Sequence, residues 1–412
     1  MIEAGKTFCP YCLEVHEGAY YSNANITWGV WLNRKRPGGK YVIEVEDFGK
    51  DKKPQGRFVL QEGMGSTEKL PNDIQVQILD EKSGQKTQQH RLYRGCPICA
   101  RDHNRFNKVN YILGRYPTFV VVMIGDRWAG KSAFLDAIAT GGNTEAVNRA
   151  GYERYIQYTT PATDDGTPQA TDRTSRGKSK VLMVCDKQDN QVVAVVYLVD
   201  VAGEAFNPQD QEGTTDEEME NLVWNLLSHN GAYPGADGMI FVASAVTKTD
   251  EHGVVQTQHR VAQKIYTRLC EAGLLAEKPL AYVMTHADKL VEEGNFKMIR
   301  SQGTGDEVPS MTRDTFDLTV PTSYKRKDLL PRVALEHAIV RPYNSAVFAR
   351  MDGPTKGFLV RSCALSQETV LRPDGKTKIE VKEDFLASRN VMDPLIWMLN
   401  QLKLFPLRER GE

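Results

Sequence analysis

The chain has 412 residues, with 52 Lys and Arg against 53 Asp and Glu, and a formal charge of -1. That length predicts roughly two to three domains, and the balanced charge argues against wholesale binding to nucleic acid or a membrane surface. The longest apolar run, residues 192–199, is too short for a membrane helix, and the first residues lack a signal-peptide pattern. We therefore expect a cytoplasmic protein without a membrane span.

Four of the seven cysteines form two C-P-x-C pairs, Cys9 with Cys12 and Cys96 with Cys99. Each such turn points two thiolates at one metal ion, and two turns complete a tetrahedral Cys₄ site. We predict a structural zinc held by these four cysteines. A redox C-x-x-C is the alternative, which two similar copies and the lack of a thioredoxin-like pattern argue against.

Residues 1–110 are expected to form a zinc-ribbon-like module with a β-rich insert, because strand-like runs at 41–45 and 74–78 are separated by glycine-rich turns. The module could bind nucleic acid, dock a partner or hold the N-terminus. Aromatic residues near the basic run 34–36 could form a stacking surface, or more simply the core of a small domain; they are Tyr20, Tyr21, Trp28 and Trp31.

Residues 111–412 alternate predicted strands and helices, which indicates an α/β fold with a mainly parallel sheet covered on both faces. Strands are predicted at 118–124, 180–185, 192–199, 238–243, 280–284 and 358–364, and helices at 130–139, 217–228, 256–271, 329–350 and 394–402. The short polar turn 186–190 requires one antiparallel hairpin. Polar insertions are expected near 143–178, 293–327 and 366–390.

Residues 125–132 read Gly-Asp-Arg-Trp-Ala-Gly-Lys-Ser, which matches the phosphate-loop pattern G-x-x-x-x-G-K-S between a predicted strand and a predicted helix. Backbone N–H groups of such a loop surround a β-phosphate, Lys131 reaches the β and γ oxygens, and the Ser132 hydroxyl can ligate Mg²⁺. The alternative is a glycine-rich turn with a solvated lysine. The predicted nucleotide contacts are Gly125, Asp126, Arg127, Trp128, Ala129, Gly130, Lys131, Ser132 and Ala133.

The strand predicted at 192–199 runs into Asp200-Val-Ala-Gly203-Glu204. An aspartate at the carboxyl end of a strand can hold Mg²⁺ through water, and the Gly203 N–H can contact a γ-phosphate. Glu204 could orient the attacking water, although its charge has the same sign as that of the phosphate. A plain strand-end turn is the alternative.

The strand predicted at 280–284 is followed by Thr285-His286-Ala-Asp288. The Asp288 carboxylate could accept two hydrogen bonds from guanine, which adenine cannot offer, and would therefore select GTP. A strand-end cap by threonine and aspartate is the alternative. A weaker signal is Ser362-Cys363-Ala364, whose backbone could contact the guanine carbonyl.

The order GDRWAGKS, DVAGE, THAD and SCA, with an antiparallel hairpin between the first two motifs, resembles the TRAFAC class of P-loop GTPases, the Ras-like group in its broad sense. The resemblance covers about residues 116–404. It implies a P-loop NTPase three-layer sandwich, mostly parallel with one antiparallel strand, that binds GTP, GDP and Mg²⁺ and hydrolyses GTP. The chain departs from the family where His286 replaces a lysine and Glu204 a glutamine.

The resemblance also implies two switch segments, near 159–178 and 203–216, and a threonine in the first that contacts Mg²⁺ and the γ-phosphate. Thr171 and Thr174 are the candidates, with Thr171 preferred as a Mg²⁺ ligand beside Ser132 and Asp200. Arg173 or Arg176 could act as an internal arginine finger or simply lie in a solvated basic loop. The expected catalytic residues are Lys131, Glu204 and Thr171.

The cysteine-bearing front end, the insertions and the C-terminal helix around 393–397 are similar to bacterial double-GTPase proteins of conflict-system operons. This similarity implies a role in a defence or signalling system. It also implies a protein partner, such as a second GTPase, an effector or an activator, or a homo-oligomer.

Three functions follow from these patterns. The first is a Mg²⁺-dependent GTPase switch with a zinc module, which stays slow until a partner completes the site. The second is a zinc-containing adaptor that binds nucleotide without hydrolysing it. The departures from the family pattern at Glu204 and His286 are compatible with this function. The third is an ATPase, favoured only by the histidine in the THAD motif.

Overall fold

The computed structural model describes the chain in separate stretches. They are residues 1–9, 15–23, 25–33, 42–47, 56–60, 73–102, 114–125, 129–138, 148, 153–159, 179–201, 224–228, 234–244, 248–249, 255–256, 271, 273, 278–285, 298–300, 307–309, 358–362, 367–371, 377–381 and 392–406. The chain divides into two compact units, Met1–Thr118 with His229–Pro234, and Phe119–Ser228 with Gly235–Glu412. Among the described residues, none of the helices has the length and apolar character needed to cross a membrane.

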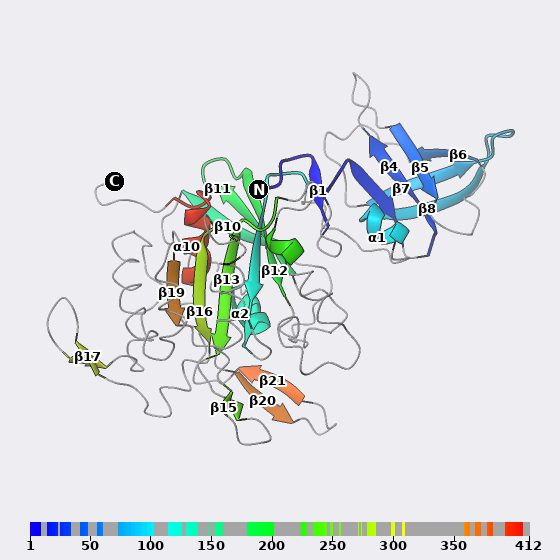
Figure 1. The fold of residues 1–412 in the computed structure, drawn as a ribbon. Helices are drawn as coiled ribbons and strands as arrows, with labels where there is room; N and C mark the ends of the chain where they lie inside the picture. The colour runs from blue at the N-terminus through cyan, green and yellow to red at the C-terminus, as the bar shows by residue number, and fades with distance from the viewer. Residues whose placement is uncertain are drawn as a thin grey trace. The chain divides into compact units, whose positions relative to one another are not determined.

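The first unit is built on a six-stranded antiparallel sheet with the order β5-β4-β3-β8-β7-β6 (Figure 1). Its strands are β3 (Ala19–Ser22), β4 (Trp28–Asn33), β5 (Val42–Asp47), β6 (Arg57–Leu60), β7 (Asp73–Leu79) and β8 (Lys86–Arg94). A separate antiparallel pair, β1 (Lys6–Phe8) and β2 (Val15–Glu17), precedes the sheet in the chain, and the helix α1 (Pro97–Asp102) follows it. Strands β3 to β8 thus lie between the two cysteine pairs in the chain.

The core of the first unit is formed by alternate side chains along its strands. In β7 the side chains of Ile74, Val76 and Ile78 are fully buried and alternate with half-buried neighbours, as expected for a strand with one face on a core. The same face carries a cluster made of Ala19, Tyr21, Trp28, Val30, Leu32 and Leu92. Tyr21 and Trp28 belong to this cluster and Tyr20 is also fully buried, as expected for the core of a small domain, whereas Trp31 is half-buried.

The second unit contains a seven-stranded sheet with the order β10-β11-β12-β9-β13-β16-β19 (Figure 1). Its strands are β9 (Thr118–Ile124), β10 (Arg154–Thr159), β11 (Ser179–Asp186), β12 (Val192–Asp200), β13 (Gly238–Ser244), β16 (Leu280–Thr285) and β19 (Phe358–Ser362). Strands β9, β13, β16 and β19 are parallel, whereas β11 runs antiparallel to both β10 and β12. The predicted parallel sheet and its antiparallel hairpin are confirmed.

Both faces of this sheet are buried, which explains the continuous apolar runs. In β9 the side chains of Val120, Val121, Val122 and Met123 are all 0% exposed, although successive residues point to opposite faces. The helices α2 (Lys131–Ile138) and α10 (Met392–Gln401) share one hydrophobic cluster with Val121 and Met123, so they cover the same face. Both helices lie close to their predicted positions.

The three expected insertions contain strands of their own. Strand β10 lies in the first, β17 (Met298–Arg300) pairs with β18 (Glu307–Pro309) in the second, and β20 (Gln367–Leu371) pairs with β21 (Thr377–Val381) in the third. A further short pair joins β14 (Lys248–Thr249) and β15 (Val255–Gln256). The helices predicted at 256–271 and 329–350 fall almost wholly outside the described residues.

Candidate functional site

The described part of the phosphate loop lies between β9 and α2. Gly130 has a positive φ of 82°, which favours glycine at that position. A side chain at Gly125 would place its Cβ 2.1 Å from the carbonyl oxygen of Val242, so only glycine fits beside the neighbouring strand β13. Asp126, Arg127 and Trp128 lie outside the described residues. The positive φ at Gly130 and the close backbone approach at Gly125 explain why the motif has glycine at its first and sixth positions.

Lys131 is the first residue of α2 and lies across the loop. Its Nζ donates a hydrogen bond to the carbonyl oxygen of Gly125 at 2.8 Å, and the residue is only 7% exposed. A buried ammonium group held beside backbone atoms at the start of a helix creates a site of positive potential. Such a site suits a phosphate group.

Ser132 and Asp200 meet although they are far apart in sequence. The Ser132 Oγ donates to Asp200 Oδ2 at 2.7 Å, and Asp200 is 0% exposed at the carboxyl end of β12. The N–H of the next residue, Val201, donates to the carbonyl oxygen of Met123 at 3.2 Å and so fixes this strand end against β9. Hydroxyl and carboxylate oxygens are the ligands that Mg²⁺ prefers, so this pair fits the predicted metal position.

Thr285 joins the base-recognition motif to the phosphate loop. Its Oγ1 donates to the carbonyl oxygen of Ala129 at 2.5 Å, and the residue is fully buried at the end of β16. The sequence analysis placed Thr285 among the nucleotide contacts but missed this link, because no local pattern reports a contact between residues 156 positions apart. The Thr285 hydroxyl therefore helps to hold the phosphate loop in its conformation.

The structure brings together only part of the predicted nucleotide site. Ser362 ends β19, next to Met284 of β16 in the parallel register. Ala133 lies in α2. The other predicted residues of this site lie outside the described residues; they are Thr171, Gly203, Glu204, His286, Asp288, Cys363 and Ala364.

Solved structures of GTPases are similar to this chain at low identity. One is the signal recognition particle receptor SRb-GTP/SRX complex from Chaetomium thermophilum, with 16% identity, a TM-score of 0.29, and coverage of 61% of this chain and 92% of that chain. Another is a septin GTPase domain from Chlamydomonas reinhardtii, with 12% identity, a TM-score of 0.31, and coverage of 70% and 95%. A third is the GDP-bound FeoB G-domain from S. thermophilus, with 14% identity, a TM-score of 0.19, and coverage of 44% and 48%.

No family model matches the sequence, and no curated protein matches it. With TM-scores this low, the structural likeness carries no argument about the site. What the chain itself shows is a mainly parallel sheet with a G-x-x-x-x-G-K-S sequence between β9 and α2.

A second candidate site is a cluster of thiols in the first unit. The Sγ atoms of Cys9, Cys96 and Cys99 lie within 4.8 Å of one another, and all three residues are buried. The Cys99 N–H donates to Cys96 Sγ at 3.4 Å, which is the backbone-to-sulfur contact expected in a metal-binding turn. Cys9 of the first C-P-x-C pair thus lies beside both cysteines of the second, and three buried sulfurs suit zinc. Cys12 lies outside the described residues.

His16 lies in β2 near this cluster but is not one of the three residues whose ligand atoms lie together. Its ring packs edge-on against Trp31, with centroids 5.8 Å apart. Burial, with the nearby Arg94 charge, lowers the pKa of His16 to about 4. The imidazole is therefore neutral at pH 7, and among the described residues the cluster consists of three thiols and no histidine.

Proposed function

We propose that the chain is a Mg²⁺-dependent protein that binds GTP, hydrolyses it and acts as a molecular switch. The supporting observation is the convergence of Lys131, Ser132 and Asp200 at the phosphate loop, with Ser132 Oγ and Asp200 Oδ2 only 2.7 Å apart. A solvated glycine-rich turn would not bury the lysine and an aspartate from another strand.

Each side chain would have a defined task. Lys131 and the loop N–H groups would bind the phosphates, and Ser132, Asp200 and Thr171 would hold Mg²⁺, which neutralises charge on the β and γ oxygens when bound. Gly203 would contact the γ-phosphate, and Glu204 would orient the attacking water. Catalysis by such a site is positioning and charge stabilisation rather than covalent chemistry.

The base would be recognised at the ends of β16 and β19. Asp288 would accept hydrogen bonds from guanine, the His286 ring would lie along the base, and the backbone of residues 362–364 would contact the guanine carbonyl. Thr285 is three residues before Asp288 and is fixed to the phosphate loop, so the two halves of the site would be positioned together.

The thiol cluster would hold a structural zinc through Cys9, Cys12, Cys96 and Cys99, because four thiolates leave no open position for chemistry. We expect a protein partner or a second copy to complete hydrolysis. The placement in a bacterial conflict or signalling system stays a prediction of the sequence resemblance.

Equilibrium binding of GTP and ATP in the presence of Mg²⁺ tests the proposal. We expect GTP to bind and ATP to bind far more weakly, and Lys131→Ala to abolish binding, because the buried ammonium is lost. Lys82→Ala, which removes an exposed lysine from the β7–β8 turn, is the control and should bind like the wild type. Tight GTP binding by Lys131→Ala would overturn the phosphate-loop assignment.

Guanine selection is tested by Asp288→Asn. An amide presents a donor where guanine needs an acceptor, so GTP should bind more weakly and xanthosine triphosphate should bind instead. Competition against a labelled nucleotide measures the affinity of the variant for GTP and for xanthosine triphosphate. Unchanged GTP affinity would remove Asp288 from the site.

A further inference from the structure

Strand β10 ends the seven-stranded sheet, with β11 as its neighbour among the described strands. Along any strand, backbone N–H and C=O groups of alternate residues point to opposite edges. A row of such groups at a sheet edge is a template on which a strand from another chain can add. We therefore expect the outer edge of β10 to be protected against strand addition.

The side chain of Asn148 supplies that protection at the middle of β10. Its Nδ2 donates to the carbonyl oxygen of Ile156 at 3.0 Å, and its Oδ1 accepts from the Ile156 N–H at 3.0 Å. A carboxamide has the same donor and acceptor as a peptide group. These two bonds reproduce what a residue of an added strand would make with Ile156 in a hydrogen-bonded antiparallel pair.

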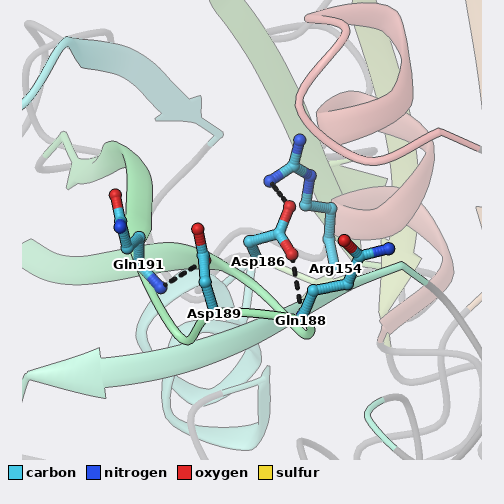
Figure 2. A network of polar contacts seen from close by, with 5 residues as sticks. All are labelled: Arg154, Asp186, Gln188, Asp189 and Gln191. Carbon is cyan, nitrogen blue, oxygen red and sulfur yellow. Dashed lines mark hydrogen bonds and ion pairs between the residues drawn. The ribbon is translucent and has the colours of Figure 1, made fainter.

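Asn148 is itself held in place from the end of β11. The Nζ of Lys187 donates to the Asn148 carbonyl oxygen at 2.7 Å, while the Lys187 N–H donates to the Glu153 carbonyl oxygen at 3.0 Å. Beside them, Arg154 Nη1 lies 2.5 Å from Asp186 Oδ2, and Asp186 Oδ1 also accepts from the N–H of Gln188 (Figure 2). Asn148 is therefore held both through its side-chain carboxamide and through its backbone carbonyl.

We propose that the Asn148 carboxamide occupies the position of a partner strand on the β10 edge and so blocks strand addition by a second copy of this chain. A copy is the relevant partner because a twofold axis beside β10 would place this strand antiparallel to its own copy, so the same edge could pair with itself without any other protein. Ile156 is 1% exposed and belongs to the core, so opening this edge leaves the strand itself in place. The inference does not depend on nucleotide binding.

Two variants of Asn148 separate edge closure from a general loss of stability. Asn148→Ala removes both bonds to Ile156. Asn148→Asp keeps the acceptor for the Ile156 N–H and loses the donor to the Ile156 carbonyl oxygen, while its charge at the edge itself opposes strand addition. Gln157→Ala, which removes an exposed amide side chain from the same strand, is the matched control.

Amide hydrogen exchange at Ile156 and sedimentation of the full-length protein give the two measurements. We expect exchange at Ile156 to be about tenfold faster in Asn148→Ala than in the wild type, less accelerated in Asn148→Asp, which keeps the acceptor for the Ile156 N–H, and little changed in Gln157→Ala. Only Asn148→Ala should self-associate more strongly than the wild type. Equal exchange in the wild type and Asn148→Ala, or equal self-association of Asn148→Ala and Asn148→Asp, would overturn the proposal.

Discussion

The hydroxyl of Thr285 connects two motifs of the nucleotide site, because it donates to the Ala129 carbonyl oxygen at 2.5 Å from a fully buried position. Replacing Thr285 with Val keeps the shape of the side chain but removes the donor. A buried carbonyl then loses its partner, which costs about 1–3 kcal/mol. The loop should be held less firmly in the conformation that receives phosphate.

We predict that Thr285→Val lowers GTP affinity about tenfold, whereas Thr285→Ser, which keeps the hydroxyl, stays near the wild type. Isothermal titration calorimetry measures both variants, and thermal unfolding shows whether each remains folded. If the valine variant bound GTP as tightly as the wild type, the hydroxyl would not position the loop.

At the scale of the elements, the long apolar strands could be predicted almost residue for residue, because burial on both faces leaves a continuous hydrophobic run. Strand β9 spans Thr118–Ile124, which is the predicted range. Strand β10 was missed, because Arg154–Thr159 reads Arg-Tyr-Ile-Gln-Tyr-Thr, which has neither a continuous apolar run nor a strict polar–apolar alternation, and lies inside a polar insertion. Long-range contacts, such as Ser132 with Asp200, follow from the sheet order and not from local pattern.

The packing of β3 on β4 gives a prediction about an element of the first unit. A Cβ at Gly29 would lie 2.1 Å from the hydroxyl oxygen of Tyr20, whose side chain is 0% exposed. Gly29→Ala should therefore destabilise this unit by about 1–3 kcal/mol, as overpacking of a core usually does. Urea unfolding measures the loss.

A double variant identifies the cause. Gly29→Ala combined with Tyr20→Leu should lose less stability than the sum of the two single variants, because the shorter side chain makes room for the new methyl group. Additive losses would mean that the contact between Gly29 and Tyr20 does not limit the packing.

At the scale of the whole molecule, the sequence patterns indicate two candidate chemical centres, but they do not say how the residues of each centre are supported. The convergence of Cys9 with Cys96 and Cys99 follows from the repeated C-P-x-C turn, which is specific enough to predict a shared site. The burial of His16 and the Asn148 contact on β10 depend on tertiary packing, which no local pattern reports. Such contacts are visible only once the strands are placed.

Zinc content distinguishes the thiol cluster from the other cysteines. We predict one zinc per chain, lost in Cys96→Ser but retained in Cys185→Ser, which replaces a buried cysteine of β11 outside the cluster. Chelation should lower the stability of the first unit and leave GTP binding in place, because the nucleotide-site residues belong to the second unit. Zinc retained at wild-type stoichiometry by Cys96→Ser would contradict the cluster assignment.

The most direct test of the central claim is phosphate release from the purified full-length chain with Mg²⁺ and GTP, compared with ATP and with Lys131→Ala. The account predicts slow release from GTP, none from ATP, and none from the variant, because its phosphate loop lacks the buried ammonium group. GTP binding without release, even with candidate partners added, would contradict a hydrolysing switch and favour an adaptor. Equal release from GTP and ATP would contradict guanine selection.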